Sequence, residues 1–269
     1  MVLGLVVAGC AGGGEPAAPP VSIGSDLPAA APAGPGVDFP VTAVPRPIVL
    51  TGPQRETVER AEGEKVKAEE LGFAGEFRFT GVAPPSPGSA PVVLPDGPAT
   101  LPLIGVADAV AAMSAEGRGG VPLDLVSVEL GTASFHTDRG PVQLPAWRFR
   151  SVFGSVFAWP AITPEAFWKP GGVPHSNRSA TTSDGVELSV ELGAPFEPCP
   201  GGKPVFKEPV AVESETSVRI TVRITGGPLG DCLHRLLPRS QSYPVKLAAP
   251  LGSRLLLDED NGVIPVVTR

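Results

Sequence analysis

Two stretches near the C-terminus alternate apolar and polar residues at every position, and this period of two restricts them to β-strands. In 218–225, Val, Ile, Val and Ile alternate with Arg, Thr, Arg and Thr, and 185–192 has the same pattern. Such alternation is typical of strands with one buried and one solvated face. Further strands are expected at 241–247, 254–258 and 263–267, the last after an Asn261-Gly262 turn. The sequence therefore predicts a β-rich domain over 181–269, an antiparallel sheet or small sandwich.

The region 48–180 has a mixed pattern and is expected to be α+β. Pro53 and Gly72 bracket a charged stretch that predicts a weak, solvated helix or a mobile excursion over 54–71. A second helix is expected at 106–116, strands at 48–50, 73–80, 100–104 and 124–130, and a loop at 83–91. The turn residues 138–140 between 132–137 and 145–153 predict a hairpin, and 157–172 is expected to be an irregular connection. The predicted fold class is α+β, mostly β.

The chain before residue 48 has the composition of a tether. Gly and Pro number 33 and 34 in the chain, about a quarter of it, and the stretch 11–47 is mostly Ala, Gly and Pro. Without apolar periodicity such a stretch buries too little surface to offset the entropy of ordering. We therefore expect an extended or flexible tether that reaches about 35 Å as a coil.

Cys10 ends a short apolar N-terminus and follows Val-Ala-Gly at 7–9, which is similar to the lipobox of a lipoprotein signal peptide. In that interpretation 1–9 is an incomplete signal peptide, because it has no basic residue, and the thiol of Cys10 carries the lipid. The alternative is a chance cysteine in an apolar N-terminus. Apart from the N-terminus, no run of 18 apolar residues that would predict a transmembrane helix is present.

The other two cysteines, Cys199 and Cys232, form an even pair in a chain that is expected to be exported. An oxidising compartment favours a disulfide between them. Closing that loop would stabilise the fold by roughly 3–4 kcal/mol in the chain-entropy model. A metal site and free thiols remain as alternatives.

Charge and motif content limit the classes of partner. The net charge of −7 argues against nucleic acid, because phosphate binding requires a basic surface. The sequence has no glycine-rich phosphate loop, and its three histidines are scattered without metal-ligand spacing. The acidic run 258–260 lacks the alternation of a calcium loop and is expected to be a solvated turn. No cofactor and no metal site is predicted.

Two groups of residues are candidates for chemistry or binding. His136 and Asp138 lie beside the predicted hairpin turn and, with a serine such as Ser134, would supply part of a hydrolytic triad. Asp and Gly are also ordinary turn residues, so a structural hairpin is the alternative. A second candidate is a stacking surface for a sugar or peptide, or else a set of core or interface anchors. It consists of Trp147, Trp159 and Trp168.

Thr-Asp-Arg-Gly-Pro at 137–141 is followed by Leu-Pro-Ala-Trp at 144–147. The C-terminal half carries a cysteine, a strand-like 212–218, a later cysteine and the segment 250–254. These segments resemble those of a family of uncharacterised actinobacterial secreted lipoproteins. The resemblance covers about 95–269 and implies export, lipidation and a two-part β-rich body, but no activity.

These observations predict a lipid-anchored protein on the outer face of the cytoplasmic membrane. The leading hypothesis is a non-enzymatic binding or scaffolding module whose partner is an envelope protein or wall polymer. The alternative is a cell-envelope hydrolase that uses His136 and Asp138. The expected order is a signal peptide (1–9), a lipidated and disordered tether (10–47), an α+β region (48–180) and a β-rich domain (181–269).

Overall fold

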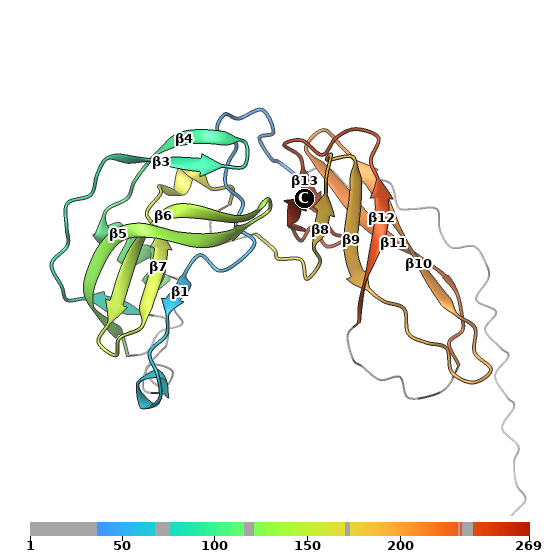
Figure 1. The fold of residues 1–269 in the computed structure, drawn as a ribbon, viewed down its shortest axis with the longest axis horizontal. Helices are drawn as coiled ribbons and strands as arrows, with labels where there is room; N and C mark the ends of the chain where they lie inside the picture. The colour runs from blue at the N-terminus through green and yellow to red at the C-terminus, as the bar shows by residue number, and fades with distance from the viewer. Residues whose placement is uncertain (1–36, 68–75, 116–120, 170–172, 231, 233–238) are drawn as a thin grey trace, which may run out of the picture. The chain divides into compact units, whose positions relative to one another are not determined.

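A long antiparallel hairpin of β5 (Leu123–Thr137) and β6 (Gly140–Ser151) dominates the N-terminal sheet (Figure 1). The computed structural model describes residues 37–67, 76–115, 121–169, 173–230, 232 and 239–269. The sheet has the order β1-β7-β6-β5-β2, and all neighbours are antiparallel except β2 and β5. The remaining strands of this sheet are β1 (Glu56–Glu59), β2 (Phe77–Phe79) and β7 (Val156–Pro160).

The hairpin predicted around 138–140 is confirmed. Gly140 has a φ of +90°, a conformation that residues with a Cβ rarely adopt, and it begins β6 directly after the turn. The two strands expected at 124–130 and 132–137 are one continuous strand. Gly131, which separates them in the sequence, stays in the strand and leaves room for the side chain of Arg148 from β6.

The helix expected over 54–71 is wrong in its first part. Residues Glu56–Glu59 are β1, which pairs with the edge of β7. A helical turn begins only at residue 64, and 68–71 lie outside the described residues. The β-branched Thr57 and Val58 suit a strand, and pairing with β7 overrides the weak helical propensity of this charged stretch.

The irregular connection expected over 157–172 is also wrong in its first part, because it contains β7. All five residues of β7 are buried. Phe157 and Trp159 belong to one hydrophobic cluster and Ala158 to another, so both faces of the strand are covered. A strand buried on both faces shows no polar alternation, which is the signal that the prediction relied on. A short 3-10 helix, η1 (Pro164–Ala166), follows, and 170–172 lie outside the described residues.

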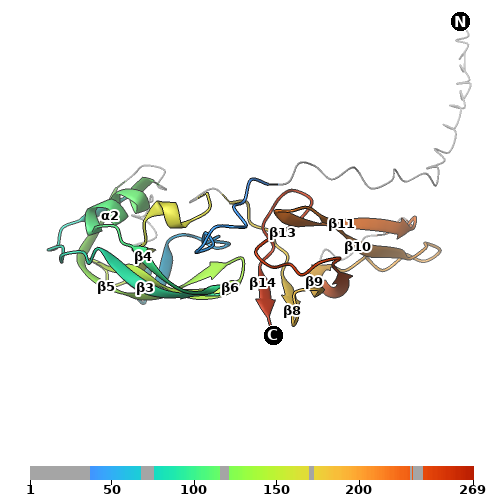
Figure 2. The same ribbon diagram turned by 90° about the horizontal axis from the view of Figure 1, so that it is seen from above.

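The two faces of the N-terminal sheet carry separate hydrophobic clusters, since alternate residues of β6 point to opposite sides. On one face, α2 (Val106–Ala115) packs against β2 and β7 over Trp147 and Phe149 (Figure 2). On the other, the hairpin of β3 (Ser89–Leu94) and β4 (Gly97–Pro102) packs over Phe135 and Leu144. The helix predicted at 106–116 is confirmed to residue 115, whereas β3 begins inside the loop predicted at 83–91.

Residues 180–268 form two further sheets whose apolar faces share one cluster. One sheet has the order β12-β9-β8-β14 and the other β10-β11-β13. The long pairs are antiparallel, as predicted, while β11–β13 and β8–β14 are parallel. The strands are β8 (Ala180–Thr182), β9 (Glu187–Gly193), β10 (Val205–Glu213), β11 (Ser217–Gly226), β12 (Ser240–Lys246), β13 (Leu255–Leu257) and β14 (Val266–Thr268).

The alternating strands at 185–192 and 218–225 are confirmed as β9 and β11, but β10 is missed. Its residues alternate poorly, and most of them are only half-buried. The strand-like segment 212–218 comprises the end of β10, the turn of the β10–β11 hairpin at 214–216 and the start of β11, and Ser214 bonds across the turn to Ser217. The mostly-β fold class predicted from the sequence is nevertheless confirmed.

Cys199 and Cys232 form the predicted disulfide, with their Cα atoms 5.9 Å apart. Cys199 is buried, and its backbone N–H donates to the carbonyl of Leu229 at 2.8 Å. Gly202 lies so close to Leu229 that a Cβ there would meet the Leu229 carbonyl oxygen at 2.0 Å. The disulfide therefore locks two tightly packed loops that precede β10 and follow β11.

Residues 37–50, here called the strap, correct the predicted extent of the tether. Phe39 is buried and contacts Trp168 edge-on at 5.4 Å between ring centroids. It shares a cluster with residues of both halves, namely Val49, Leu255, Leu257 and Val263. The strap also bonds to β11's turn, because Thr216 donates its hydroxyl to the carbonyl of Val37 at 2.8 Å. The end of the predicted tether, 37–47, is thus packed, while 10–36 lie outside the described residues.

Candidate functional site

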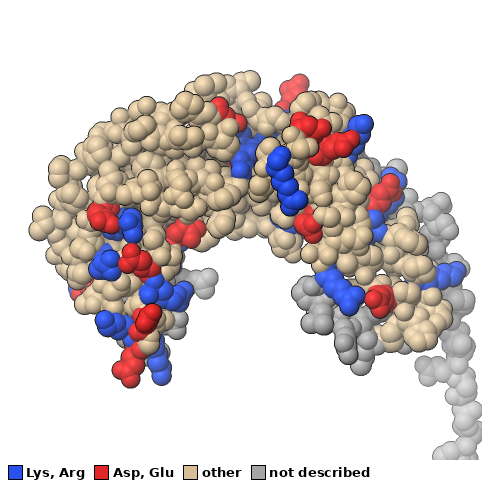
Figure 3. Space-filling view, viewed as in Figure 1, with Lys and Arg blue, Asp and Glu red and all other residues tan. Residues whose placement is uncertain are grey.

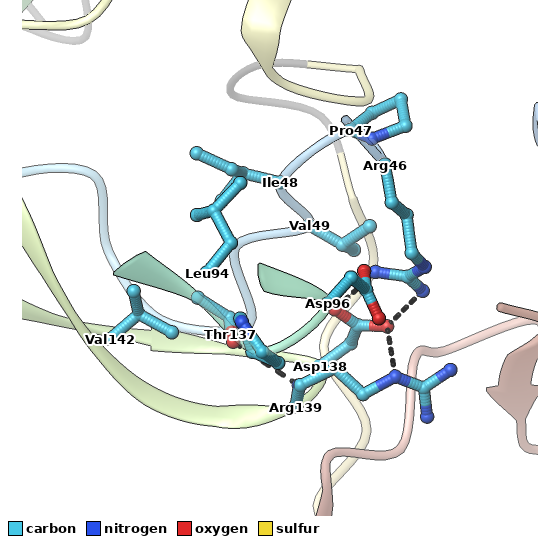
Figure 4. Close-up of a pocket in the computed structure, with 11 residues that line it drawn as sticks. Arg46, Pro47, Ile48, Val49, Leu94, Asp96, Thr137, Asp138, Arg139 and Val142 are labelled. Carbon is cyan, nitrogen blue, oxygen red and sulfur yellow. Dashed lines mark hydrogen bonds and ion pairs between the residues drawn. The ribbon is translucent and has the colours of Figure 1, made fainter. Parts of the chain in front are cut away.

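The hairpin tip contains a buried ion pair that no local sequence pattern predicts. The guanidinium of Arg46, in the strap, donates to both carboxylate oxygens of Asp138, at 2.5 and 3.2 Å (Figure 4). Both residues are buried, with 7% and 2% of their surface exposed. The backbone of Asp138 is also fixed, since its N–H donates to Val49 and its carbonyl accepts from Val266. Two-pronged Arg–carboxylate pairs of this kind are strong and geometrically specific.

Arg139 and Arg46 extend the ion pair to the loop before β13. Arg139 donates to the carbonyls of Gly252 and Arg254, each at 2.7 Å, and its Nε lies 3.8 Å from Asp138. Arg46 donates through its Nε to the carbonyl of Ser253 at 3.0 Å. Burial lowers the pKa of Arg139, and the neighbouring Asp138 carboxylate opposes that shift. The cluster therefore fastens the strap, the hairpin tip and the 252–254 loop to one another.

His136 does not join this cluster. It is exposed on β5, and its backbone carbonyl accepts the N–H of Thr51. Its imidazole makes no hydrogen bond to Asp138 among the bonds of the described residues, and both Asp138 oxygens are taken by Arg46. Ser134 lies two residues earlier on the same side of the strand. The structure thus separates the two residues that the sequence suggests as half of a triad.

Glu56 is a titratable group near His136 that the sequence did not single out. Burial raises the pKa of Glu56, and the positive charge of His136 opposes the rise. One carboxylate oxygen is buried and has no hydrogen-bond partner among the described residues. Either a solvated helix or a mobile excursion over 54–71 would leave this carboxylate in water, so the sequence gives no sign of its burial.

Replacing Glu56 by glutamine is expected to stabilise the fold near pH 7. A pKa raised in the folded state means that ionised Glu56 destabilises that state, and the penalty grows as pH rises above the group's ordinary pKa. Glutamine removes the charge, so thermal unfolding should occur at a higher temperature near pH 7 and at an unchanged temperature at about pH 3.5. Glu62→Gln, at an exposed position, is the control and should show no pH-dependent gain. An equal gain at both pH values would contradict the prediction.

The three tryptophans do not form a common binding surface. Trp147 and Trp159 are 0% and 3% exposed and belong to the cluster under α2. The indole N–H of Trp147 donates to the carbonyl of Ile104 at 2.9 Å. Trp168 lies in a different cluster, against Phe39 of the strap, and donates to the carbonyl of Asp38. The geometry corrects the stacking surface and supports the alternative of core and interface anchors.

The acidic turn 258–260 serves the backbone. Asp258 is buried and accepts the N–H groups of Asp260 and Gly262, at 3.0 and 2.7 Å. Glu259 pairs with Arg178, and this contact lowers the pKa of Glu259. No group of three or more potential metal ligands occurs within the described parts of the chain. His234 lies outside those parts.

A pocket lies beside the ion pair, between the strap, the β3–β4 hairpin and η1. Its volume is about 170 Å³. A smaller pocket next to it contains Asp96, Asp138 and Arg139 (Figure 4). The lining of the larger pocket is mostly apolar and consists of Pro45, Arg46, Pro47, Ile48, Leu94, Leu101, Glu165 and Ala166. Apolar pockets with a few polar groups at their margin are the usual form of ligand sites.

Membrane-spanning helices and similarity to known proteins were both sought as indications of function. Among the described residues, no helix has the length and apolar character needed to cross a bilayer. Comparison of the chain with protein-family models, with curated proteins and with solved structures found no match.

Proposed function

We propose that this protein is a membrane-anchored extracytoplasmic lipoprotein that acts as a binding or scaffolding module of the cell envelope. The observation that carries the proposal is that both carboxylate oxygens of Asp138 are bonded to Arg46. The most reactive-looking cluster of the sequence is an internal fastening, so the hairpin tip supports a rigid body and Asp138 is not available to orient His136. A rigid β-body with an apolar pocket is suited to binding.

The disulfide supports the proposed location. Disulfides persist in oxidising compartments outside the cytoplasm. Cys199 and Cys232 are paired, which leaves Cys10 as the remaining cysteine of the sequence and the proposed lipid attachment site. Cys10 itself lies outside the described residues.

Cys10→Ser is expected to release the protein from membranes, because the acyl chain has no attachment site without the thiol. The measurement is the distribution of the full chain between membrane and soluble fractions of the host after a carbonate wash. Ser25→Ala, in the same N-terminal stretch, is the matched control and should remain with the membranes. Membrane retention of the Cys10→Ser protein would contradict lipid anchoring.

Cross-linking of the full chain in intact host cells tests the binding role. The expected result is a defined protein or glycan adduct whose cross-linked peptides map to 37–269 of this chain. Fragments that begin at residue 49 should be avoided, since they lack Arg46 and Phe39 of the strap. A wall-hydrolysing activity of the purified protein that disappears in His136→Ala would overturn the proposal in favour of the hydrolase.

A further inference from the structure

We infer that the pocket between the strap and η1, here called the strap pocket, binds a peptide segment of a partner. The segment presents a leucine-sized apolar side chain next to a lysine or arginine. This inference rests on the proposed binding function and names the ligand chemistry for it.

The walls of the strap pocket are preformed. Ile48 and Leu94 are buried in the cluster under the β3–β4 hairpin, and Leu101 of β4 packs in the same cluster. The strap is fixed at this point, because Ile48 donates its N–H to Ala166 at 2.9 Å and accepts from Trp168. Pro45 and Pro47 restrict the backbone on either side of Arg46. A pocket with such walls loses little conformational entropy when a ligand enters.

The size of the strap pocket matches one side chain. Its volume is about 170 Å³. An engineered apolar cavity of about 150 Å³ accommodates benzene, so the strap pocket has room for one leucine-sized group. A free molecule of that size makes few contacts, whereas a peptide adds contacts from the neighbouring chain. The surface around β3 and β4 can supply them, since Figure 3 shows few charges there and Val93 is 78% exposed.

The charge at the margin favours a cation. Asp96 and Glu165 are exposed, and in the described part of the chain neither forms an ion pair within 4.0 Å. The third nearby carboxylate, Asp138, is neutralised by Arg46. Asp96 acts on Arg139 only at longer range. Glu165, which lines the pocket, is therefore available to a lysine or arginine that flanks the inserted side chain.

Binding of short blocked peptides to the full chain tests this assignment. The probes are acetyl-Gly-Leu-Lys-Gly-amide and two variants, in which glutamate replaces the lysine or alanine replaces the leucine. The measurement is the shift of backbone amide resonances in a 15N-labelled sample. The Leu-Lys peptide should give saturable shifts confined to the neighbourhood of 45–48, 94–96 and 165–166, with a dissociation constant on the order of millimolar. The two variant peptides should bind more weakly.

Two substitutions make the test specific. Ala166→Leu fills the strap pocket from its wall and should weaken binding more than about tenfold. Glu165→Gln removes the exposed carboxylate and should weaken it about twofold to fivefold. Ala111→Leu on α2 and Glu215→Gln in the β10–β11 turn are exposed controls and should bind like the wild type. Amide resonances outside the pocket that match those of the wild type show that each variant is folded.

Three outcomes would overturn the inference: no saturable shift with the Leu-Lys peptide, equal binding of the Leu-Glu peptide, or undiminished binding by folded Ala166→Leu. Each leaves the envelope cross-linking result untouched. A partner that is cross-linked but does not compete with the Leu-Lys peptide shows that the binding role stands while this ligand assignment fails. Loss of every cross-link together with intact peptide binding shows the reverse.

Discussion

Asp138→Ala is expected to lower the free energy of unfolding by about 3–5 kcal/mol, because it leaves the guanidinium of Arg46 buried without its counter-charge. Arg46 keeps its bond to Ser253 and its position 4.6 Å from the centroid of the Phe39 ring, but these contacts cannot replace a carboxylate. The measurement is urea-induced unfolding followed by tryptophan fluorescence. The midpoint should fall with little change in the slope of the transition.

Two comparisons distinguish the loss of the buried ion pair from the general effect of removing a charge. Asp124→Ala breaks an exposed pair with Arg78 at 2.7 Å and should cost only about 0–1 kcal/mol. The double variant Arg46→Met/Asp138→Leu replaces both charges by apolar side chains and should recover much of the loss. If Asp138→Ala proved no more damaging than Asp124→Ala, the ion pair would not be the fastening described above.

Trp147→Ala is expected to cost about 3–5 kcal/mol, since it removes a large buried side chain from the centre of the cluster under α2. The substitution also leaves the carbonyl of Ile104 without its indole donor. Part of the loss should therefore persist in Trp147→Phe, which restores most of the volume but not the hydrogen bond. Chemical denaturation monitored by far-ultraviolet circular dichroism measures both variants.

Trp168→Ala is the matched comparison. Trp168 is half-buried at the strap, so its loss should be smaller than that of Trp147. A stable Trp147→Ala protein that no longer forms the proposed cross-links in the envelope would instead indicate a direct binding role for this tryptophan.

The strands that the sequence predicts correctly are those with one wet face. In β9 the alternation of side chains matches burial directly, and in β11 it does so as far as Ile220, whereas Ile224 farther along is exposed. β7 has no wet face. β1 is short and charged, its backbone pairs with β7, and its Glu59 forms ion pairs with arginines of β6. Such strands depend on neighbours that are distant in the chain, and local composition therefore indicates an irregular segment and a helix instead.

The prediction of a catalytic pair, His136 and Asp138, fails for a related reason. His136 and Asp138 are two residues apart, yet β5 ends between them, and the turn directs Asp138 toward Arg46. That partner lies 92 positions away in a stretch whose composition resembles a linker. The prediction identified the hairpin tip as a place of interest, but the residue that determines its chemistry is a long-range partner with no local motif. The disulfide was predictable because a pair of cysteines in a chain that is expected to be exported has few alternatives.

The strap has a mechanical consequence. The chain ahead of residue 37 enters the body at Val37, and the next contacts are the buried Phe39 and the ion pair of Arg46. A pull on that N-terminal chain would thus be resisted first by a short segment wedged between the two groups of sheets. No strand would be pulled from either group of sheets until the segment had been drawn out. A protein held by its N-terminus would yield under load first at the strap, while the bonds of Arg139 to the 252–254 loop and of Val266 to Asp138 would still join the halves.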